Sequence, residues 1–459
     1  MSSDRPNILF IMTDQQSASA LSCAGSTWID TPNLDRLAAR GVRFDAAYVA
    51  YPVCTPSRAS IFSGRLPHET EAIQVRPPRD KIRADIRPDM LGHRLAAAGY
   101  RCGYGGKWHL NGTIDIPGDG SEGFEAFCGF DDFKLTEATL AWIDGAVQGD
   151  RPWFAVASYD DPHNICEWAH GQPQIWGTLP DPPPEDACPP LPANHAATPY
   201  EPAAVTDCRR WLDTLGYPIF SWGPREWRAF RWAYQQFVER VDRRIGELMD
   251  GLEARGLLEK TLIVMTSDHG DLQGEHQFHQ KCVVYEACLR VPLIAAGPGI
   301  PAGRVIPATE PVSVGIDLFP TFCDYAEADL PDGLEGRSLR PLCEGNAESL
   351  DRSSIFGMGE PNKNGNLAGG CRYVRTARHK YVAYVDGFPN EELFDLENDP
   401  GEMINLARSE AHRSILLEHR QELQAWLDRT GDRFRGGHYG FPEGYEARGV
   451  APGSGFPAW

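Results

Sequence analysis

Three short runs of nearly continuous apolar residues stand out along the chain, at 7–12, 152–160 and 261–268. Runs of this length without polar alternation are typical of strands that are covered on both faces in a parallel sheet. The segment before the third run carries a helical pattern, which gives a strand–helix–strand order. The pattern therefore predicts a doubly wound α/β sheet flanked by helices.

Two segments carry helix signals together with signals for where the helix ends. From 227 to 252, apolar residues recur at steps of three and four, and Gly256 follows as a stop signal. The sequence TPNLDRLAARG starts with Thr31 as N-cap and Pro32 in the first helical position, and it ends on a glycine.

The pattern changes in the C-terminal quarter of the chain. Residues 372–385 predict a hairpin of exposed strands, and 411–429 predict a helix. We therefore expect a main domain at 1–345 and a smaller α+β subdomain, an antiparallel sheet plus a helix, at 346–459. The end of the chain, from 434 onward, is rich in Gly, Pro and aromatic residues and is expected to lie extended over a surface. Such an aromatic tail could bridge two copies in a homo-oligomer.

A proline-rich segment at 171–202 interrupts the main domain. Strands are predicted on both sides of it, so it is an insertion and not a linker between domains. A long irregular insertion in a compact domain is often a binding loop.

Length, net charge and cysteine content limit the kinds of protein that this chain can be. The 459 residues exceed what one simple core holds. The net charge of −20 argues against nucleic acid and anionic membranes as partners. No apolar run is long enough for a membrane span, and the N-terminus has no leader-like pattern. The twelve cysteines are scattered without a C-x-x-C pair, which favours free thiols and a cytoplasmic location.

Carboxylates follow two of the predicted strands. Asp14 comes directly after the first run and Asp268 ends the third, with Gln15 and His269 beside them. Either aspartate alone is well explained as a turn residue or a helix cap. Together, at the carboxyl ends of strands in one sheet, they can share a hard divalent cation.

Further polar residues follow glycine turns or strands. GGKWHL carries Lys107 and His109, DDPHN carries His163, and HQKC carries Lys281. Each alone is explained as a solvated lysine or a histidine bonded within the core. Delivery from separate segments to one edge of one sheet favours a catalytic site.

Cys54 lies between two prolines in YPVCTPSRAS, four residues before Arg58. A buried structural cysteine needs no such neighbours. The segment 54–58 resembles the C-x-P-x-R signature of type I sulfatases, in the alkaline-phosphatase superfamily. Other stretches resemble that family in the same order: PNILFIMTDQQ, TPNLDRLAARGVRF, SGRLPHE, GKWHL, TSDHGD, YEACLRVPLI and ELFDLENDPGE. Only the insertion and the tail lie outside the resemblance.

The resemblance implies an alkaline-phosphatase-like mixed sheet and a formylglycine at position 54. A separate formylglycine-generating enzyme would oxidise Cys54 to this aldehyde (3-oxoalanine), as a transient partner. The hydrated aldehyde would attack the sulfur of a small anionic sulfate ester, and its second hydroxyl would then expel inorganic sulfate.

The resemblance also implies a cation site, with Ca²⁺ as the expected ion and Mg²⁺ or Mn²⁺ as alternatives. Its ligands would be Asp14, Gln15, Asp268 and His269, which offer oxygen or imidazole donors.

The remaining family positions imply catalytic roles. Arg58 would hold the formylglycine hydroxyl, while Lys107 and Lys281 would neutralise the sulfate oxygens. His163 or Lys281 would protonate the leaving group, and His109 would accept the proton when the diol collapses.

One departure keeps an alternative open. Many sulfatases have two consecutive aspartates where this chain has Asp14 and Gln15. The replacement of the second aspartate also occurs in the phosphonate monoester and phosphodiester hydrolases of the superfamily. Lys107 and His109 form the pair typical of sulfatases, which argues against that alternative. A non-catalytic binding protein is a third hypothesis, which the retention of Lys107, His163 and Lys281 disfavours.

Substrate contacts are predicted in and around the insertion. Trp168, His170, Asn194, His195 and Trp222 would form a polar and aromatic wall suited to a sulfated saccharide. In the competing interpretation, the tryptophans only pin the loop to the domain.

His276 and His279 follow the third strand. They leave a second metal site conceivable, although no further carboxylate cluster accompanies them. His279, close to Lys281, is a further candidate substrate contact.

Overall fold

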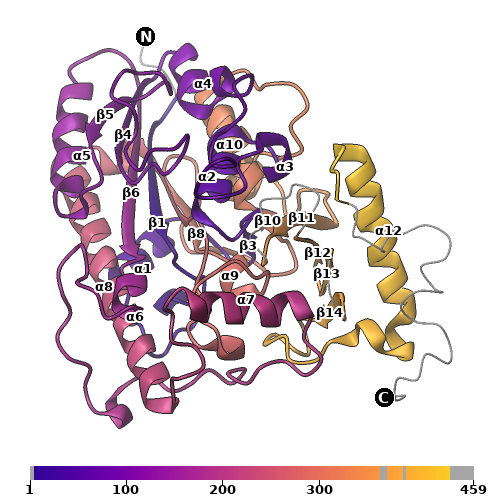
Figure 1. The fold of residues 1–459 in the computed structure, drawn as a ribbon. Coiled ribbons are helices and arrows are strands. Elements are labelled where there is room, and N and C mark those ends of the chain that lie inside the picture. The colour runs from indigo at the N-terminus through magenta and orange to yellow at the C-terminus, as the bar shows by residue number, and fades with distance from the viewer. Residues whose placement is uncertain (1–4, 362–369, 386–388, 435–459) are drawn as a thin grey trace.

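The computed structural model describes residues 5–361, 370–385 and 389–434. A mixed eight-stranded sheet lies at its centre, with helices on both faces (Figure 1). In spatial order the strands are β5 (Glu125–Cys128), β4 (Arg101–Gly106), β6 (Trp153–Pro162), β1 (Asn7–Asp14), β7 (Thr261–Ser267), β8 (Leu293–Ala296), β2 (Val42–Phe44) and β9 (Arg304–Ile306). The three predicted strands are β1, β6 and β7, which lie side by side in the middle, and the predicted α/β sheet is confirmed.

Strand β1 shows why its sequence is apolar at nearly every position. It pairs in parallel with β6 and with β7. Leu9 and Ile11 belong to one hydrophobic cluster, and Ile8 and Phe10 to another on the opposite face. Because side chains alternate between the two faces of a strand, a sheet with helices on both sides needs apolar residues in both registers.

The helices form one layer on each face of the sheet. One layer contains α1 (Pro32–Ala39), α5 (Asp132–Ala146) and α8 (Pro224–Ala254), and the other contains α2 (Cys54–Ser63), α4 (Leu91–Ala97) and α10 (Val314–Ala326). Both predicted helices are confirmed as α1 and α8. The remaining α-helices of the main domain are α3 (Pro67–Thr70), α6 (Ile165–Ala169), α7 (Ala203–Thr214), α9 (Glu286–Leu289) and α11 (Arg340–Glu344).

Antiparallel pairs occur at one side of the large sheet and beyond it. β8 runs antiparallel to both of its neighbours, β7 and β2, which makes the sheet mixed. The two short strands β3 (Ala47–Tyr48) and β10 (Val312–Ser313) pair separately. A second sheet contains β11 (Ser354–Gly359), β12 (Cys371–Thr376), β13 (His379–Tyr384) and β14 (Glu391–Asp395), all antiparallel.

The C-terminal sheet is not exposed, contrary to the prediction for 372–385. Strands β12 and β13 are buried at most positions. One face contacts the main domain, where the Tyr373 hydroxyl donates to the carbonyl of Val49 at 2.6 Å. The other face is covered by α12 (Arg413–Thr430), whose Leu423 and Trp426 pack on Val374. The predicted hairpin and helix are therefore present, but the hairpin lies between two layers.

The insertion at 171–202 contains one short 3₁₀ helix, Glu185–Ala187, and is otherwise irregular. The predicted boundary at 345 falls just after α11, which still packs on α10 of the main domain. The aromatic tail predicted to lie on a surface is outside the described residues. Within the described part of the chain, every helix is too short or too polar to cross a membrane.

Candidate active site

The carboxyl ends of four neighbouring strands bring the predicted polar residues to one place. Asp14 ends β1, Asp268 follows β7, Lys107 follows β4 and His163 follows β6. These strands run parallel to one another, so their carboxyl ends share one edge of the sheet. Cys54, the first residue of α2, lies at the same edge, with its Sγ 3.6 Å from Oδ1 of Asp14.

A compact group of ligand atoms lies at this edge. Asp14, Cys54, Asp268 and His269 each contribute one atom, and these atoms are all within 4.8 Å of one another. All four residues are buried. Nδ1 of His269 donates to the carbonyl of Gly270 at 2.9 Å, so Nε2 is the ring nitrogen that faces the group, and it offers a lone pair when the ring is deprotonated.

The two carboxylates divide their oxygens between two tasks. Oδ2 of Asp14 lies 2.7 Å from Nζ of Lys107, and Oδ2 of Asp268 accepts from Nε of Arg58 at 2.7 Å. Both Oδ1 atoms lie 3.6 Å from Nε2 of His269. Two carboxylate oxygens and an imidazole nitrogen therefore converge. This donor set fits a hard divalent cation.

Gln15 lies beside this group with its side chain fixed at both ends. Its Oε1 accepts from Nζ of Lys281 at 2.6 Å, and its Nε2 donates to Oδ2 of Asp271 at 2.7 Å. Its backbone N–H donates to Oδ1 of Asp268 at 3.2 Å. The backbone of Gln15 has a φ of 73°, a left-handed conformation that turns the chain sharply after β1.

Both acidic and basic side chains surround the thiol of Cys54. Its Sγ lies 3.1 Å from Nε2 of His269 and 3.6 Å from Nζ of Lys281. Burial raises the pKa of the thiol, and so does Asp14, but the positive charges of Lys281, His269 and Lys107 outweigh them and hold the pKa well below its ordinary value. The site therefore stabilises negative charge at position 54, and the amino end of α2 adds to this effect.

The charges of the site are set by burial and by near neighbours. Burial raises the pKa of Asp268 to about 7, and the negative charge of Asp14 adds to the rise. Burial lowers the pKa of the half-buried His163 well below its ordinary value, as do Lys107 and Lys281. His163 is thus a neutral imidazole in this arrangement.

His109 lies next to the turn that carries Cys54. Its carbonyl accepts from the hydroxyl of Thr55 at 2.8 Å, and its backbone is left-handed with a φ of 55°. Its ring Nδ1 is buried and makes no hydrogen bond within the described residues. The structure therefore places the His109 backbone at the site, with a ring nitrogen still available.

Comparison with known proteins identifies the family. The model of the sulfatase family matches residues 6–328. The chain belongs to the sulfatase family. A second model, described as N-sulphoglucosamine sulphohydrolase, C-terminal, matches residues 274–429. The family hydrolyses sulfate esters, and this sulfatase carries the acidic, basic and thiol side chains described above at the position where the four strands end.

Named relatives of this sulfatase span nearly its whole length. A Δ4,5-hexuronate-2-O-sulfatase of Bacteroides thetaiotaomicron is 28% identical, with 94% of this chain and 91% of the relative covered. A choline-sulfatase of Rhizobium meliloti is 29% identical, with 89% of this chain and 84% of the relative covered. The solved structure of a 2-O GAG sulfatase superposes with a TM-score of 0.80 at 27% identity, covering 93% of each chain. The predicted superfamily and its mixed-sheet fold are thereby confirmed.

The predicted substrate wall falls into two parts. Trp168 and Trp222 pack on each other, with ring centroids 6.3 Å apart, and His279 lies 5.2 Å from the Trp222 ring. His170 stacks on Tyr217 at 4.0 Å.

Asn194 and His195 form the second part and hold the insertion in place. Asn194 donates to Glu275 at 2.8 Å and to the carbonyl of Gly401 at 3.1 Å. Nδ1 of His195 donates to the carbonyl of Gly274 at 2.6 Å. Both side chains therefore anchor the insertion to neighbouring segments of the protein.

Three residues that sequence reasoning missed support the site from behind. Asp160 accepts from Nζ of Lys107 at 2.8 Å through Oδ1, and from the indole N–H of Trp176 at 2.9 Å through Oδ2. Asp271 holds Gln15, as described above. Asp160 ends the apolar run predicted at 152–160 and lies near the end of β6, so its position could have suggested it. Trp176, inside the proline-rich insertion, carries no such signal.

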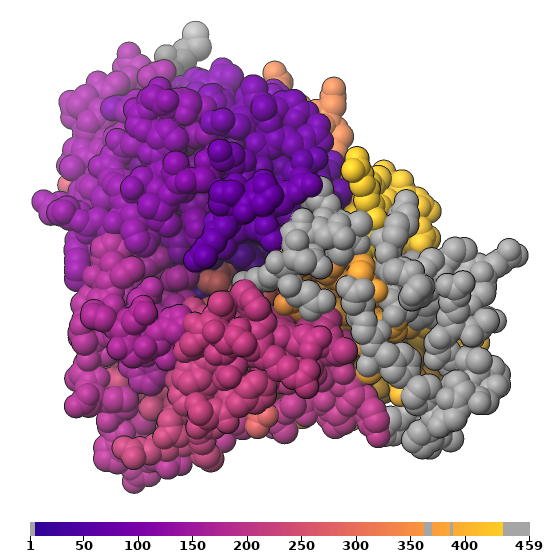
Figure 2. Space-filling model, in the orientation of Figure 1, coloured from indigo at the N-terminus to yellow at the C-terminus, as the bar shows by residue number. Residues whose placement is uncertain are grey.

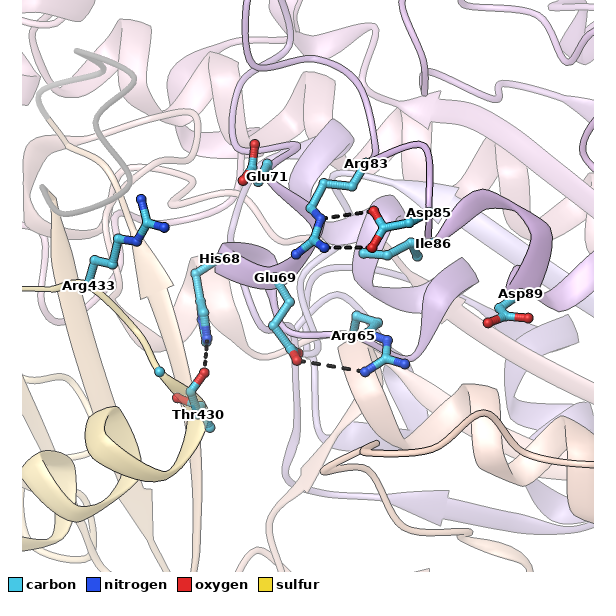
Figure 3. A pocket seen from close by; sticks show the side chains of 11 residues that line it. Arg65, His68, Glu69, Glu71, Arg83, Asp85, Ile86, Asp89, Thr430 and Arg433 are labelled. Atoms are coloured by element: carbon cyan, nitrogen blue, oxygen red, sulfur yellow. Dashed lines mark hydrogen bonds and ion pairs between the residues drawn. The ribbon is translucent and has the colours of Figure 1, made fainter.

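A separate cavity of about 390 Å³ lies beyond the other end of α2, near α3 and the end of α12 (Figure 3). Two pairs of its charged residues contact each other: Arg83 with Asp85 at 2.6 Å, and Arg65 with Glu69 at 3.8 Å. The surface in Figure 2 is also hollowed between the indigo N-terminal region and the pink region that contains α7.

Proposed function

We propose that this sulfatase hydrolyses a sulfate ester of a saccharide, using a formylglycine derived from Cys54 and one divalent cation, with Ca²⁺ as the first choice. The observation that carries the proposal is the position of Sγ of Cys54, 3.1 Å from Nε2 of His269 and 3.6 Å from Nζ of Lys281. Relatives named for hexuronate 2-O-sulfate and N-acetylglucosamine 6-O-sulfate support a saccharide substrate.

Asp14, Gln15, Asp268 and His269 would hold the cation. When bound, such a cation supplies positive charge that makes a neighbouring hydroxyl more acidic. Arg58 keeps the carboxylates in place, since it donates to Asp268 at 2.7 Å and to Asp14 at 3.2 Å. Every donor of this network comes from a buried side chain, so the geometry exists before substrate arrives.

Lys107 and Lys281 would receive the sulfate group. Both ammonium groups are buried, and nearby acidic groups raise their pKa values above the ordinary range although burial acts in the opposite direction. They are therefore charged at neutral pH and can neutralise oxygens as charge builds in the transition state. Lys281, which is charged, would protonate the leaving oxygen, or His163 would do so after gaining a proton, and His109 would take the proton that leaves the diol.

A phosphonate monoester or phosphodiester activity is the second candidate, because Gln15 stands where many sulfatases have aspartate. The phosphonate monoester hydrolase of Agrobacterium radiobacter shares the fold, with a TM-score of 0.74 at 23% identity. Parallel rates on 4-nitrophenyl sulfate and bis(4-nitrophenyl) phosphate distinguish the two. A phosphodiester rate above the sulfate rate would overturn the preferred assignment.

The first test is mass spectrometry of the tryptic peptide 44–58 from protein made with a formylglycine-generating enzyme. We expect the sulfur of Cys54 to be replaced by an aldehyde oxygen. The matched variant Cys54→Ala should lose turnover by at least about a thousandfold, because the nucleophile is gone, while its thermal unfolding stays close to that of the parent. Activity in the variant, or in fully unconverted protein, would refute the nucleophile.

A further inference from the structure

We propose that Asp271 is a positioning residue that fixes the orientation of the Gln15 amide and keeps its carbonyl oxygen on the Lys281 side. The proposal rests on the proposed function in one respect, since it treats Gln15 as a ligand of the cation. Asp271 follows the TSDHG stretch and is fully buried. None of the roles assigned above uses its carboxylate directly.

Both oxygens of Asp271 receive hydrogen bonds from neutral N–H groups. Oδ1 accepts from the backbone N–H of Gln273 at 2.7 Å. Oδ2 accepts from the backbone N–H of Gln280 at 3.0 Å and from Nε2 of Gln15 at 2.7 Å. A buried carboxylate without a direct cationic partner is unfavourable for folding, so three converging donors are needed to hold it.

This arrangement leaves the Gln15 amide only one orientation. A carboxylate can only accept, so the NH₂ group of Gln15 must face Asp271. Nζ of Lys281 can only donate, so Oε1 of Gln15 must face Lys281, 2.6 Å away. The reversed amide would set oxygen against oxygen and N–H against N–H at these two contacts.

Asp271 also fixes the segment that delivers Lys281. The backbone N–H of Gln280, the residue before Lys281, is one of its three donors. A single carboxylate therefore sets the position of both partners in the Gln15–Lys281 hydrogen bond. It also places a negative charge one hydrogen bond behind the amide, which polarises the carbonyl oxygen toward a cation. This charge stands behind the position where many sulfatases have a second aspartate.

The test is Asp271→Asn. The asparagine must turn its NH₂ group either toward Gln15 and Gln280 or toward Gln273, so one set of N–H donors loses its acceptor. We expect Ca²⁺ affinity, measured by calorimetry on the full chain, to fall about tenfold or more. We also expect a crystal structure of the variant to show the Gln15–Lys281 hydrogen bond broken.

Asp242→Asn is the matched control. Asp242 is equally buried, and it also accepts from one side-chain amide and two backbone N–H groups, those of Asn33 and Leu34. It lies on α8 and takes no part in the site, so its variant should lose stability but keep Ca²⁺ affinity. In a Gln15→Met background, where there is no amide to orient, Asp271→Asn should change Ca²⁺ affinity by less than about twofold.

The outcomes separate this proposal from the proposed function. If the parent binds no divalent cation, the cation role fails, and Asp271 is then judged from the Gln15–Lys281 contact in the variant structure. If the parent binds Ca²⁺, and Asp271→Asn with its NH₂ group facing Gln15 binds it equally well or keeps the Gln15–Lys281 contact, the positioning role is wrong. If that NH₂ group faces Gln273, the acceptor for Gln15 is retained, and the neutron measurement described next decides. If the variant does not fold, neutron diffraction of the parent decides: deuterons of Gln15 pointing away from Asp271 would overturn the proposal.

Discussion

At the scale of single residues, burial controls the protonation state of polar side chains, and His279 is the clearest example. Its ring is fully buried among Trp222, Trp227 and Phe230. Neither ring nitrogen has a hydrogen-bond partner within the described residues. Burial lowers the pKa of His279 to about 3, and His170 adds a small repulsion. The folded protein therefore holds His279 as a neutral ring.

Replacing His279 by Phe should change how stability depends on pH. An unfolded histidine has a pKa of about 6.5, so between pH 6.5 and about 3 the unfolded chain binds one proton more than the folded chain. This term lowers the free energy of unfolding as pH falls. From pH 7 to pH 5, urea unfolding should show the parent losing about 2 kcal/mol more than the variant. His276, with a similarly lowered pKa, is present in both proteins and cancels. Equal pH dependence in the two proteins would contradict the assignment.

At the scale of elements, the insertion at 171–202 is in contact with the residues of the candidate active site. Trp176 packs its ring on Phe130 and Phe133, with centroids 5.1 and 5.9 Å away. Its indole N–H reaches Asp160 at the end of β6, and Asp160 in turn holds Lys107 after β4. An irregular loop is thus connected through one carboxylate to Lys107, the lysine proposed to receive the sulfate group.

Trp176→Phe should reduce turnover while leaving the loop packed. The phenyl ring keeps the contacts with Phe130 and Phe133, but one oxygen of Asp160 loses its donor, and Lys107 loses part of its support. We expect kcat to fall about tenfold, with KM changed by less than about threefold.

Trp142→Phe serves as the control for this change. Trp142 also donates its indole N–H to a carboxylate, that of the exposed Glu125, at 3.1 Å. Its variant should keep kcat within about twofold, because Glu125 lies outside the site. A Trp176→Phe enzyme with parental kcat would show that the insertion does not support Lys107.

At the scale of the whole molecule, the two sheets are joined by buried charges. Nζ of Lys380, on β13, lies 3.1 Å from Glu286 on α9 and also contacts Glu402. Lys380 is fully buried, and Arg375 on β12 adds a hydrogen bond to the hydroxyl of Tyr48. The C-terminal sheet and the main domain therefore share an interior, although a boundary at 345 stays a prediction.

Lys380→Met should destabilise the whole protein by about 3–5 kcal/mol, because it leaves Glu286 and the buried Glu402 without their cationic partner. Urea unfolding followed by fluorescence and by circular dichroism should show a single transition that moves to lower urea. The largely exposed pair Arg429–Glu335, between α12 and the main domain, gives the comparison, and Arg429→Gln should cost less than about 1 kcal/mol. Loss of the C-terminal signal alone in Lys380→Met would mean that the two parts unfold independently.

The sequence predicted the elements whose pattern is local. Strands β1, β6 and β7 and helices α1 and α8 follow from apolar periodicity and end signals, and Asp14 and Asp268 follow from their places after strands. Asp271 and Trp176 could not be predicted in their roles, because each acts through a contact with another segment. The Asp271–Gln15 hydrogen bond, for example, joins positions 256 residues apart.

The hairpin at 372–385 shows how a polar pattern can mislead. Arg372 and Lys380 are typical of solvent-facing positions, yet both are fully buried. Arg372 donates to Asp432 at 2.6 Å, and Lys380 pairs with Glu286 and Glu402. A buried charge needs a partner of opposite sign, and the partner's place in space is not visible in the local sequence.

The burial of α2 limits the time at which another enzyme can reach Cys54 during synthesis of the protein. Every residue of this helix is buried, including Thr55, Pro56, Ser57 and Arg58, so no other enzyme can read the stretch around Cys54 in the finished protein. Lys281, which closes over the thiol, lies 227 residues downstream. At about 5–20 residues per second, a ribosome needs roughly 10–50 s to reach it, so the proposed oxidation of Cys54 in the nascent chain would have about that long. Protein that folded before this step would keep its thiol, and a modifying enzyme supplied afterwards would not reach it.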